Sequence, residues 1–256
     1  MNIEIKRTVR AGNSSAVILP RAWLNQEVRV ELVNKTNDKI LHEALTIVSK
    51  HMNTKEIIGV YLVGSYARGE ESKESDIDIL IITHNTDKEM INEGIYNILI
   101  VSEKLLNWKL KNDLLPLGMM IREAVPLINS SYLDSIKINT NKVNLKWYVD
   151  TTKDKLELIR RALDSTRGKV ANSVIYTLIL RIRTLYTIRK LIDNEKYSKK
   201  EFVKLISKVS GSDSAYGAYV LVKNDLQKDA LVTKREAERL YYYLIKQLKE
   251  VIELLK

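Results

Sequence analysis

The feature that most constrains the fold is an apolar strand that runs directly into a small polar turn. Residues Ile57–Val63 are almost continuously apolar, which predicts a strand buried in the middle of a sheet, and Gly64-Ser65 follows at once. A second apolar strand is expected over 75–82. The other elements expected in this region are a strand over 95–101 and helices over 36–52, 86–93 and 103–112. Strands that alternate with helices in this way indicate a sheet with flanking helices.

The two ends of the chain have other periodicities. Residues 3–10 and 27–33 alternate between apolar and polar side chains, with turn residues over 12–15 and a short helix expected over 20–24. Such a β-rich unit is too small to bury a core alone. Beyond about residue 140 the apolar residues recur at helical spacing. Helices are expected there over 144–166, 170–193, 199–209, 215–225 and 233–255.

These patterns predict an α+β multidomain protein. Its expected parts are a small β-rich N-terminal clip (1–34), a sheet with flanking helices (35–140) and a C-terminal helical bundle (141–256). The 256 residues include no Cys, which excludes a disulfide scaffold and a Cys nucleophile and fits a reducing cytoplasm. No apolar run approaches the ~20 residues of a membrane-spanning helix, and the N-terminus lacks the apolar core of a signal peptide. We therefore expect a cytoplasmic protein with no membrane partner.

The formal charge of +10 is unevenly distributed. Residues 1–34 carry 5 basic and 3 acidic side chains, residues 35–140 carry 12 and 15, and residues 141–256 carry 25 and 14. Almost the whole excess thus belongs to the helical part. This asymmetry predicts that a polyanionic partner binds there.

The stretch Gly64-Ser65-Tyr66-Ala67-Arg68-Gly69 carries the first half of a chemical signal. Ser65 can open a helix whose first N–H groups, with the Ser65 hydroxyl, suit an anion. Gly64 has no side chain to obstruct a phosphate. Arg68, about one turn later, can reach a phosphate or clamp an acid.

The second half of the signal is Ser75-Asp76-Ile77-Asp78. Residues two apart on a strand point the same way, so the carboxylates of Asp76 and Asp78 share one face. Paired carboxylates beside a phosphate site are what Mg²⁺ needs to bridge a triphosphate and an acceptor. Either half alone is a weak signal, but both occur in order within 15 residues after an apolar strand.

GSYARG…SDIDILI resembles the signature of the polymerase-β-like nucleotidyltransferases, especially their minimal (MNT-type) branch. The likeness covers about residues 36–130. It implies a mixed sheet and Mg²⁺-dependent transfer of an NMP from an NTP to an acceptor. It further implies that Gly64 and Ser65 hold the triphosphate and that Asp76 and Asp78 bind Mg²⁺. The implied sets are therefore catalytic Asp76, Asp78 and Ser65, and nucleotide-binding Gly64, Ser65, Arg68 and Ser75.

The chain departs from this family at one point. A third acid usually stands on a later strand, where it helps to activate the acceptor hydroxyl. The matching strand here, 95–101, contains no carboxylate, although Asn97 can coordinate a metal weakly and Glu93 and Glu103 flank the strand. The sequence thus predicts an intact NTP–Mg²⁺ site and leaves acceptor activation open.

The N-terminal run KRTVRAGNSSAVILPRAWL resembles AbrB-type swapped-hairpin domains over about residues 3–33. The resemblance implies a homodimer whose intertwined strands complete one small barrel. Such domains often bind DNA, and the alternative is a clip that only dimerises. The DNA-binding candidates are Lys6, Arg7, Arg10, Asn13 and Ser14.

Two functions follow for the whole chain. The first is an enzyme whose acceptor is an RNA 3′ end, slightly favoured by the basic helices, a protein hydroxyl or a small molecule. The second is a DNA-binding dimer or toxin–antitoxin component that binds nucleotide with little or no turnover. A helical HEPN-type ribonuclease is excluded, because all three His residues precede the helical part. The basic side chains considered as an RNA, DNA or triphosphate platform, against an ordinary solvated helix face, are Arg160, Arg161, Arg167, Lys169, Arg181, Arg183, Arg189 and Lys190.

Overall fold

The computed structural model describes residues 4, 6, 8–30, 36–72, 75–226, 229 and 231–255. The chain forms two compact units. The sheet unit comprises Met1–Asn107 and Glu123–Lys137, and the helical unit comprises Trp108–Arg122 and Ile138–Lys256. The domain boundaries expected at residues 34 and 140 stay predictions.

The sheet unit is built on a five-stranded mixed sheet with the order β5-β6-β4-β3-β7. Its strands are β3 (Ile57–Val63), β4 (Ile77–Thr83), β5 (Lys88–Glu93), β6 (Tyr96–Ser102) and β7 (Val125–Ile128). β4 and β6 are parallel, and the other neighbouring strands are antiparallel. The mixed sheet expected from the sequence is thus confirmed, and β3 has the predicted bounds.

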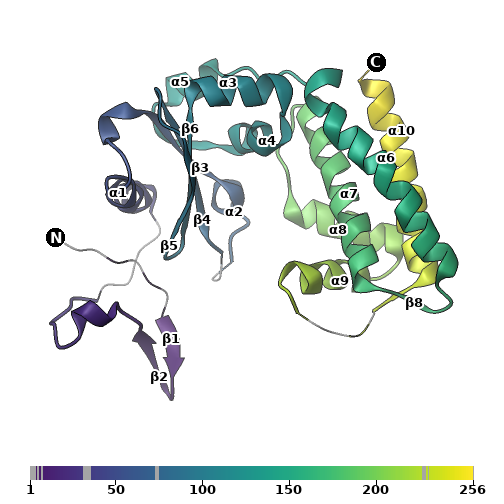
Figure 1. The fold of residues 1–256 in the computed structure, drawn as a ribbon, viewed down its shortest axis with the longest axis horizontal. Coiled ribbons are helices and arrows are strands. Elements are labelled where there is room, and N and C mark those ends of the chain that lie inside the picture. Colours follow the sequence, from purple (N-terminus) through teal and green to yellow (C-terminus); the bar gives the residue numbers. More distant parts are fainter. Residues whose placement is uncertain are drawn as a thin grey trace. The chain divides into compact units, whose positions relative to one another are not determined.

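One face of this sheet is covered by α1 (Asn37–Val48), which Thr36 caps by accepting a hydrogen bond from the Lys39 N–H (Figure 1). The core between them contains buried Ile40, Ala44, Ile47 and Val48 from the helix and Ile77, Ile79, Tyr96, Ile98 and others from the strands. Because side chains alternate along a strand, Asp78 and Asn97 lie on the opposite face of the sheet. Both faces of β4 are largely buried, and these two polar groups lie on the face that does not meet α1.

The helix expected over 86–93 is wrong, because Lys88–Glu93 is the edge strand β5. A two-residue connection, Gly94-Ile95, joins β5 to β6, and Glu93 pairs with Tyr96 across it. Gly94 has φ 63°, a conformation that glycine adopts without strain. Pairing with β6 overrides the weak local preference of the DKEMINE segment.

The remaining short elements include three that the sequence did not predict. Beyond α3 (Glu103–Asn112), which was expected, the chain forms α4 (Leu115–Glu123), β7 and α5 (Ser130–Ser135). The helix α2 (Gly64–Arg68) follows β3 directly. Pro126 lies on β7, an edge strand, where its missing N–H is tolerated.

The N-terminal segment folds into a two-stranded hairpin of β1 (Thr8–Ala11) and β2 (Ser14–Val17). A single 3₁₀ turn, η1 (Arg21–Trp23), follows Pro20. The strand expected over 27–33 is absent from 27–30, and 31–33 lie outside the described residues. A strand needs a partner, and Val28 and Val30 remain exposed within this one chain.

The helical unit contains the five helices that the helical spacing of apolar residues predicted. They are α6 (Lys142–Ser165), α7 (Asn172–Ile192), α8 (Lys199–Ser210), α9 (Ser214–Lys223) and α10 (Lys234–Leu254), with a small β8 (Lys169–Val170) and β9 (Val232–Thr233) pair. α7 packs against α6, α9 and α10, which explains why its buried residues occupy most of its circumference. Among the described residues, no helix is both long and apolar enough to cross a membrane.

Candidate nucleotide and metal site

The centre of the candidate site is the contact between Gly64 and Asp78. Val63, the last residue of β3, pairs with Asp78 on β4, so Gly64 begins beside the Asp78 carboxylate. Gly64 has φ +71°, and a Cβ built on it would lie 2.2 Å from Asp78 Oδ2. Only glycine fits here, because any side chain would collide with the carboxylate and strain the backbone. The sequence reasoning assigned this openness to a phosphate, whereas the nearest atom is a carboxylate oxygen.

The two carboxylates expected to hold Mg²⁺ are placed differently. Asp76 is exposed and immediately precedes β4, whereas Asp78 is half-buried within the strand. Asn97 pairs with Asp78 in the β4–β6 ladder, and its Nδ2 donates a 3.1 Å hydrogen bond to Asp78 Oδ1. An amide thus stands beside Asp78 where a further acid was sought, and it orients the Asp78 carboxylate.

The donor set bears on whether a metal fits here. In the part of the chain that the structure describes, no cluster of three or more His, Cys, Asp or Glu side chains could hold a metal ion. Mg²⁺, however, commonly uses one or two carboxylates together with substrate phosphates. Asp76 and Asp78 therefore fit a metal that arrives with a triphosphate better than a resident one.

The two serines of the motif have separate places. Ser65 is half-buried in the first turn of α2, next to Gly64, and its carbonyl accepts a 2.9 Å hydrogen bond from the Glu70 N–H. Ser75 Oγ accepts a 2.8 Å hydrogen bond from the Ser72 N–H and lies 3.1 Å from Ser72 Oγ. The Ser75 hydroxyl thus stabilises the turn before β4.

Arg68 clamps acids in this structure. Its Nη1 donates to Glu123 Oε2 at 2.7 Å and its Nε donates to Glu70 Oε2 at 3.0 Å. Glu123 Oε1 also accepts a 2.9 Å hydrogen bond from the Gly64 N–H. Of the two roles that the sequence left open for Arg68, binding of acids is the one observed.

Glu123 is the residue that sequence reasoning missed. It is only 4% exposed and lies at the end of α4, 59 positions from Gly64. Burial raises its pKa, although the nearby Arg68 and the Gly64 N–H oppose this shift; Asp78 adds to it by repulsion. The one available signal was a lone acid at the end of α4, whose sequence is apolar apart from Arg122 and Glu123, and no local pattern links it to Gly64.

The DNA-binding candidates lie on the exposed hairpin or beside it. Lys6 forms an ion pair with Glu4 at 3.3 Å, and the Arg10 Nε donates to the Gly12 carbonyl at 3.3 Å. Asn13 and Ser14 are exposed at the turn. Arg7 lies outside the described residues. DNA binding by this group stays a prediction.

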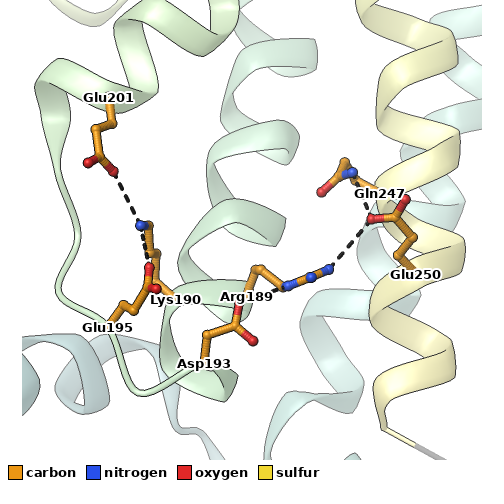
Figure 2. Close-up of polar contacts among 7 residues, drawn as sticks. All are labelled: Arg189, Lys190, Asp193, Glu195, Glu201, Gln247 and Glu250. Atoms are coloured by element: carbon orange, nitrogen blue, oxygen red, sulfur yellow. Dashed lines mark hydrogen bonds and ion pairs between the residues drawn. The ribbon is translucent and has the colours of Figure 1, made fainter.

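Most cations considered as a polyanion platform have partners within the helical unit. Figure 2 shows Arg189 between Asp193 and Glu250, and Lys190 between Glu195 and Glu201. The other ion pairs are Arg160 with Asp164 and Arg161 with Glu157. These contacts make the exposed α6 and α7 faces less positive than a count of Lys and Arg suggests.

Two further arginines of α7 are also engaged. Arg183 is half-buried, donates to the Tyr219 hydroxyl at 3.1 Å and lies 5.4 Å from the Tyr197 ring centroid. Arg181 donates to Thr151 Oγ1 at 3.1 Å. Tyr176, on the same helix, stacks on Tyr219 with ring centroids 5.2 Å apart. The platform hypothesis therefore retains Arg167 and Lys169 rather than the whole basic set.

The sheet site belongs to a segment that matches a known family. Residues 43–167 match the family model described as the nucleotidyltransferase domain. Over these residues the chain is similar to nucleotidyltransferase domains. This match supports a nucleotidyltransferase enzyme and spans the whole Gly64–Asp78 contact. No curated protein matches the chain.

Similar solved structures include two with low sequence identity. One is a nucleotidyltransferase-like protein from Exiguobacterium sibiricum, 13% identical, with 84% of this chain and 77% of that chain covered and a TM-score of 0.39. Another is the spectinomycin adenyltransferase AAD(9) from Enterococcus faecialis with ATP and spectinomycin, 14% identical, with 81% and 99% covered and a TM-score of 0.41.

Proposed function

We propose that the protein transfers an NMP from a Mg²⁺-bound NTP to a hydroxyl acceptor. The observation that carries this proposal is the contact of Gly64 with Asp78 at the end of β3, inside the segment that matches the nucleotidyltransferase domain. Asp76 immediately precedes β4 and Asp78 is its second residue, so both carboxylates belong to the same end of this strand.

In this mechanism Asp76 and Asp78 would hold the Mg²⁺ that arrives with the triphosphate. The metal supplies charge neutralisation for the triphosphate. The Ser65 hydroxyl, beside Gly64, donates a hydrogen bond to a phosphate oxygen. Asn97 keeps the Asp78 carboxylate oriented. The acceptor oxygen then forms a bond to the α-phosphorus as the bond to the pyrophosphate leaving group breaks.

The acceptor hydroxyl would release its proton to solvent, because β6 contains no carboxylate that could take it. Asn97 occupies the ladder position beside Asp78, and an amide does not accept a proton at neutral pH. This favours slow transfer. It is also the one specific observation that favours the second function. In that function the protein is a DNA-binding dimer or toxin–antitoxin component that binds nucleotide with little or no turnover.

The N-terminal segment is proposed to join two copies of the chain. Its exposed apolar side chains include Ile18 (69%), Leu24 (71%) and Val30 (67%). A two-stranded hairpin is marginal by itself, so these side chains are expected to meet a second copy. DNA contacts through Lys6, Arg7, Arg10, Asn13 and Ser14 are proposed for that dimer.

A labelling screen tests the proposed activity. The full chain is incubated with Mg²⁺ and labelled ATP, GTP, CTP or UTP, each with and without total RNA or a cell lysate. Transfer of label to RNA supports an RNA acceptor, and transfer to protein or a small molecule redirects the acceptor assignment. Absence of label on any acceptor would count against the enzyme. The control is the same screen with EDTA.

A further inference from the structure

A single buried carboxylate holds both ends of the helix that follows β3. Glu123 Oε1 accepts from the Gly64 N–H at the start of α2, and Glu123 Oε2 accepts from Arg68 Nη1 at its end. The Glu123 side chain is 5% exposed and the Arg68 side chain 14%. A helix of five residues has too few internal hydrogen bonds to hold its own geometry, so its position depends on this external anchor.

The pairing of β7 with β3 places Glu123 beside Gly64. In this pairing Leu62 lies opposite Val125. Leu62 precedes Gly64 by two positions, and Val125 follows Glu123 by two positions. Glu123 precedes β7 and therefore lies where β3 ends. The anchor is thus fixed by strand pairing and not by the sequence around Gly64.

The anchor also acts on Asp78. Gly64 is in contact with the Asp78 carboxylate on one side and is held by Glu123 through its N–H on the other. A displaced Gly64 would change the space around Asp78 Oδ2. Arg68 balances the negative charge of Glu123, which keeps a second uncompensated carboxylate away from Asp78.

We infer that Glu123 is the positioning residue of this site: it holds the Gly64-Ser65 turn beside Asp78 so that Mg·NTP meets an ordered turn. The inference rests on the proposed function. Because the Gly64 N–H already donates to Glu123, it follows that Ser65 and later groups, rather than that N–H, meet the triphosphate.

The test compares Glu123→Gln with a matched control, Glu43→Gln. Glu43 is also in the sheet unit and accepts a 2.6 Å hydrogen bond from the Tyr96 hydroxyl, but it lies on α1, on the other side of the sheet. Both changes remove one charge and keep an acceptor oxygen. Thermal unfolding first establishes the temperature at which each variant is fully folded.

Two readouts are then taken at that temperature. Amide hydrogen exchange without nucleotide is expected to be faster over 64–68 in Glu123→Gln and unchanged in Glu43→Gln. Calorimetric titration with Mg·ATP, Mg·GTP, Mg·CTP and Mg·UTP first identifies the nucleotide that the wild type binds. Glu123→Gln is expected to bind that nucleotide about tenfold more weakly. Unchanged exchange, or binding within about twofold of the wild type, would overturn the inference.

Other outcomes separate the two proposals. A wild type that binds none of the four nucleotides refutes the proposed function, while the exchange result still decides the anchor. If Glu123→Gln does not fold, Arg68→Gln tests the same contact from its partner, with the same expected exchange and binding. The double variant should lose no more binding than either single one, because the two side chains act as a unit.

Discussion

Replacing Gly64 with Ala tests the contact on which the site is built. The new Cβ would lie 2.2 Å from Asp78 Oδ2, whereas ordinary contact begins at 3.4 Å. The carboxylate must therefore shift by about 1.2 Å, which disturbs the orientation that its 3.1 Å hydrogen bond from Asn97 gives it. A misplacement of about 1 Å in a catalytic constellation can cost about a hundredfold in rate.

The backbone adds a separate cost. Gly64 has φ +71°, where an L side chain costs about 1–2 kcal/mol. For a chain of this size the strain corresponds to a fall in Tm of about 2–8 °C. Stability and binding must therefore be separated by a variant with the same strain and no collision.

Gly69→Ala supplies that control. Gly69 ends the same helix with φ +64°, and a Cβ on it would meet no atom within 4 Å. Both variants should lose similar stability in thermal unfolding. Only Gly64→Ala should weaken Mg·NTP binding, by at least about tenfold in calorimetric titration. Equal nucleotide affinities for the two variants would refute the steric role of Gly64.

Three further predictions concern other contacts. Asn97→Asp adds a carboxylate beside Asp78, so labelled NMP transfer and its dependence on Mg²⁺ should both rise; equal transfer contradicts the role given to Asn97. Asp113 is partly buried, which raises its pKa, but hydrogen bonds from Lys109 and Tyr148 outweigh burial and hold the pKa below its usual value. Asp113→Asn should therefore lower the free energy of unfolding at pH 7 by less than about 1 kcal/mol. This difference from the wild type should vanish as the pH falls through the pKa of Asp113. A difference that stays constant with pH would contradict this prediction. Deleting residues 1–34 should convert a dimer to a monomer in light scattering, and an unchanged mass contradicts the proposed clip.

The core strands were predictable because burial on both faces leaves a direct trace in the sequence. β3, β4 and β6 are apolar runs, and the helices of the helical unit repeat their apolar residues at helical spacing. β5 lacked that trace, since its burial is confined to a few side chains and its strand conformation comes from pairing with β6. The Gly94-Ile95 connection was the signal that could have identified the hairpin.

The Gly64, Ser65 and Asp78 cluster was predictable because one short motif contains it. Glu123 was not, because it reaches Gly64 through the pairing of β7 with β3, a long-range contact that no local pattern specifies. The basic side chains of the helical part could likewise be counted from the sequence, but their ion pairs could not be assigned. The partners of these side chains, such as Glu250 for Arg189, are set by helix packing.

The most direct test of the central claim is calorimetric titration of the Asp76→Asn, Asp78→Asn double variant with Mg·NTP. Both changes keep side-chain volume and remove the charges proposed to hold Mg²⁺. The account predicts that the wild type binds an NTP in a Mg²⁺-dependent manner and that the folded double variant does not. Unchanged Mg²⁺-dependent binding in the double variant would contradict the assignment of these two carboxylates.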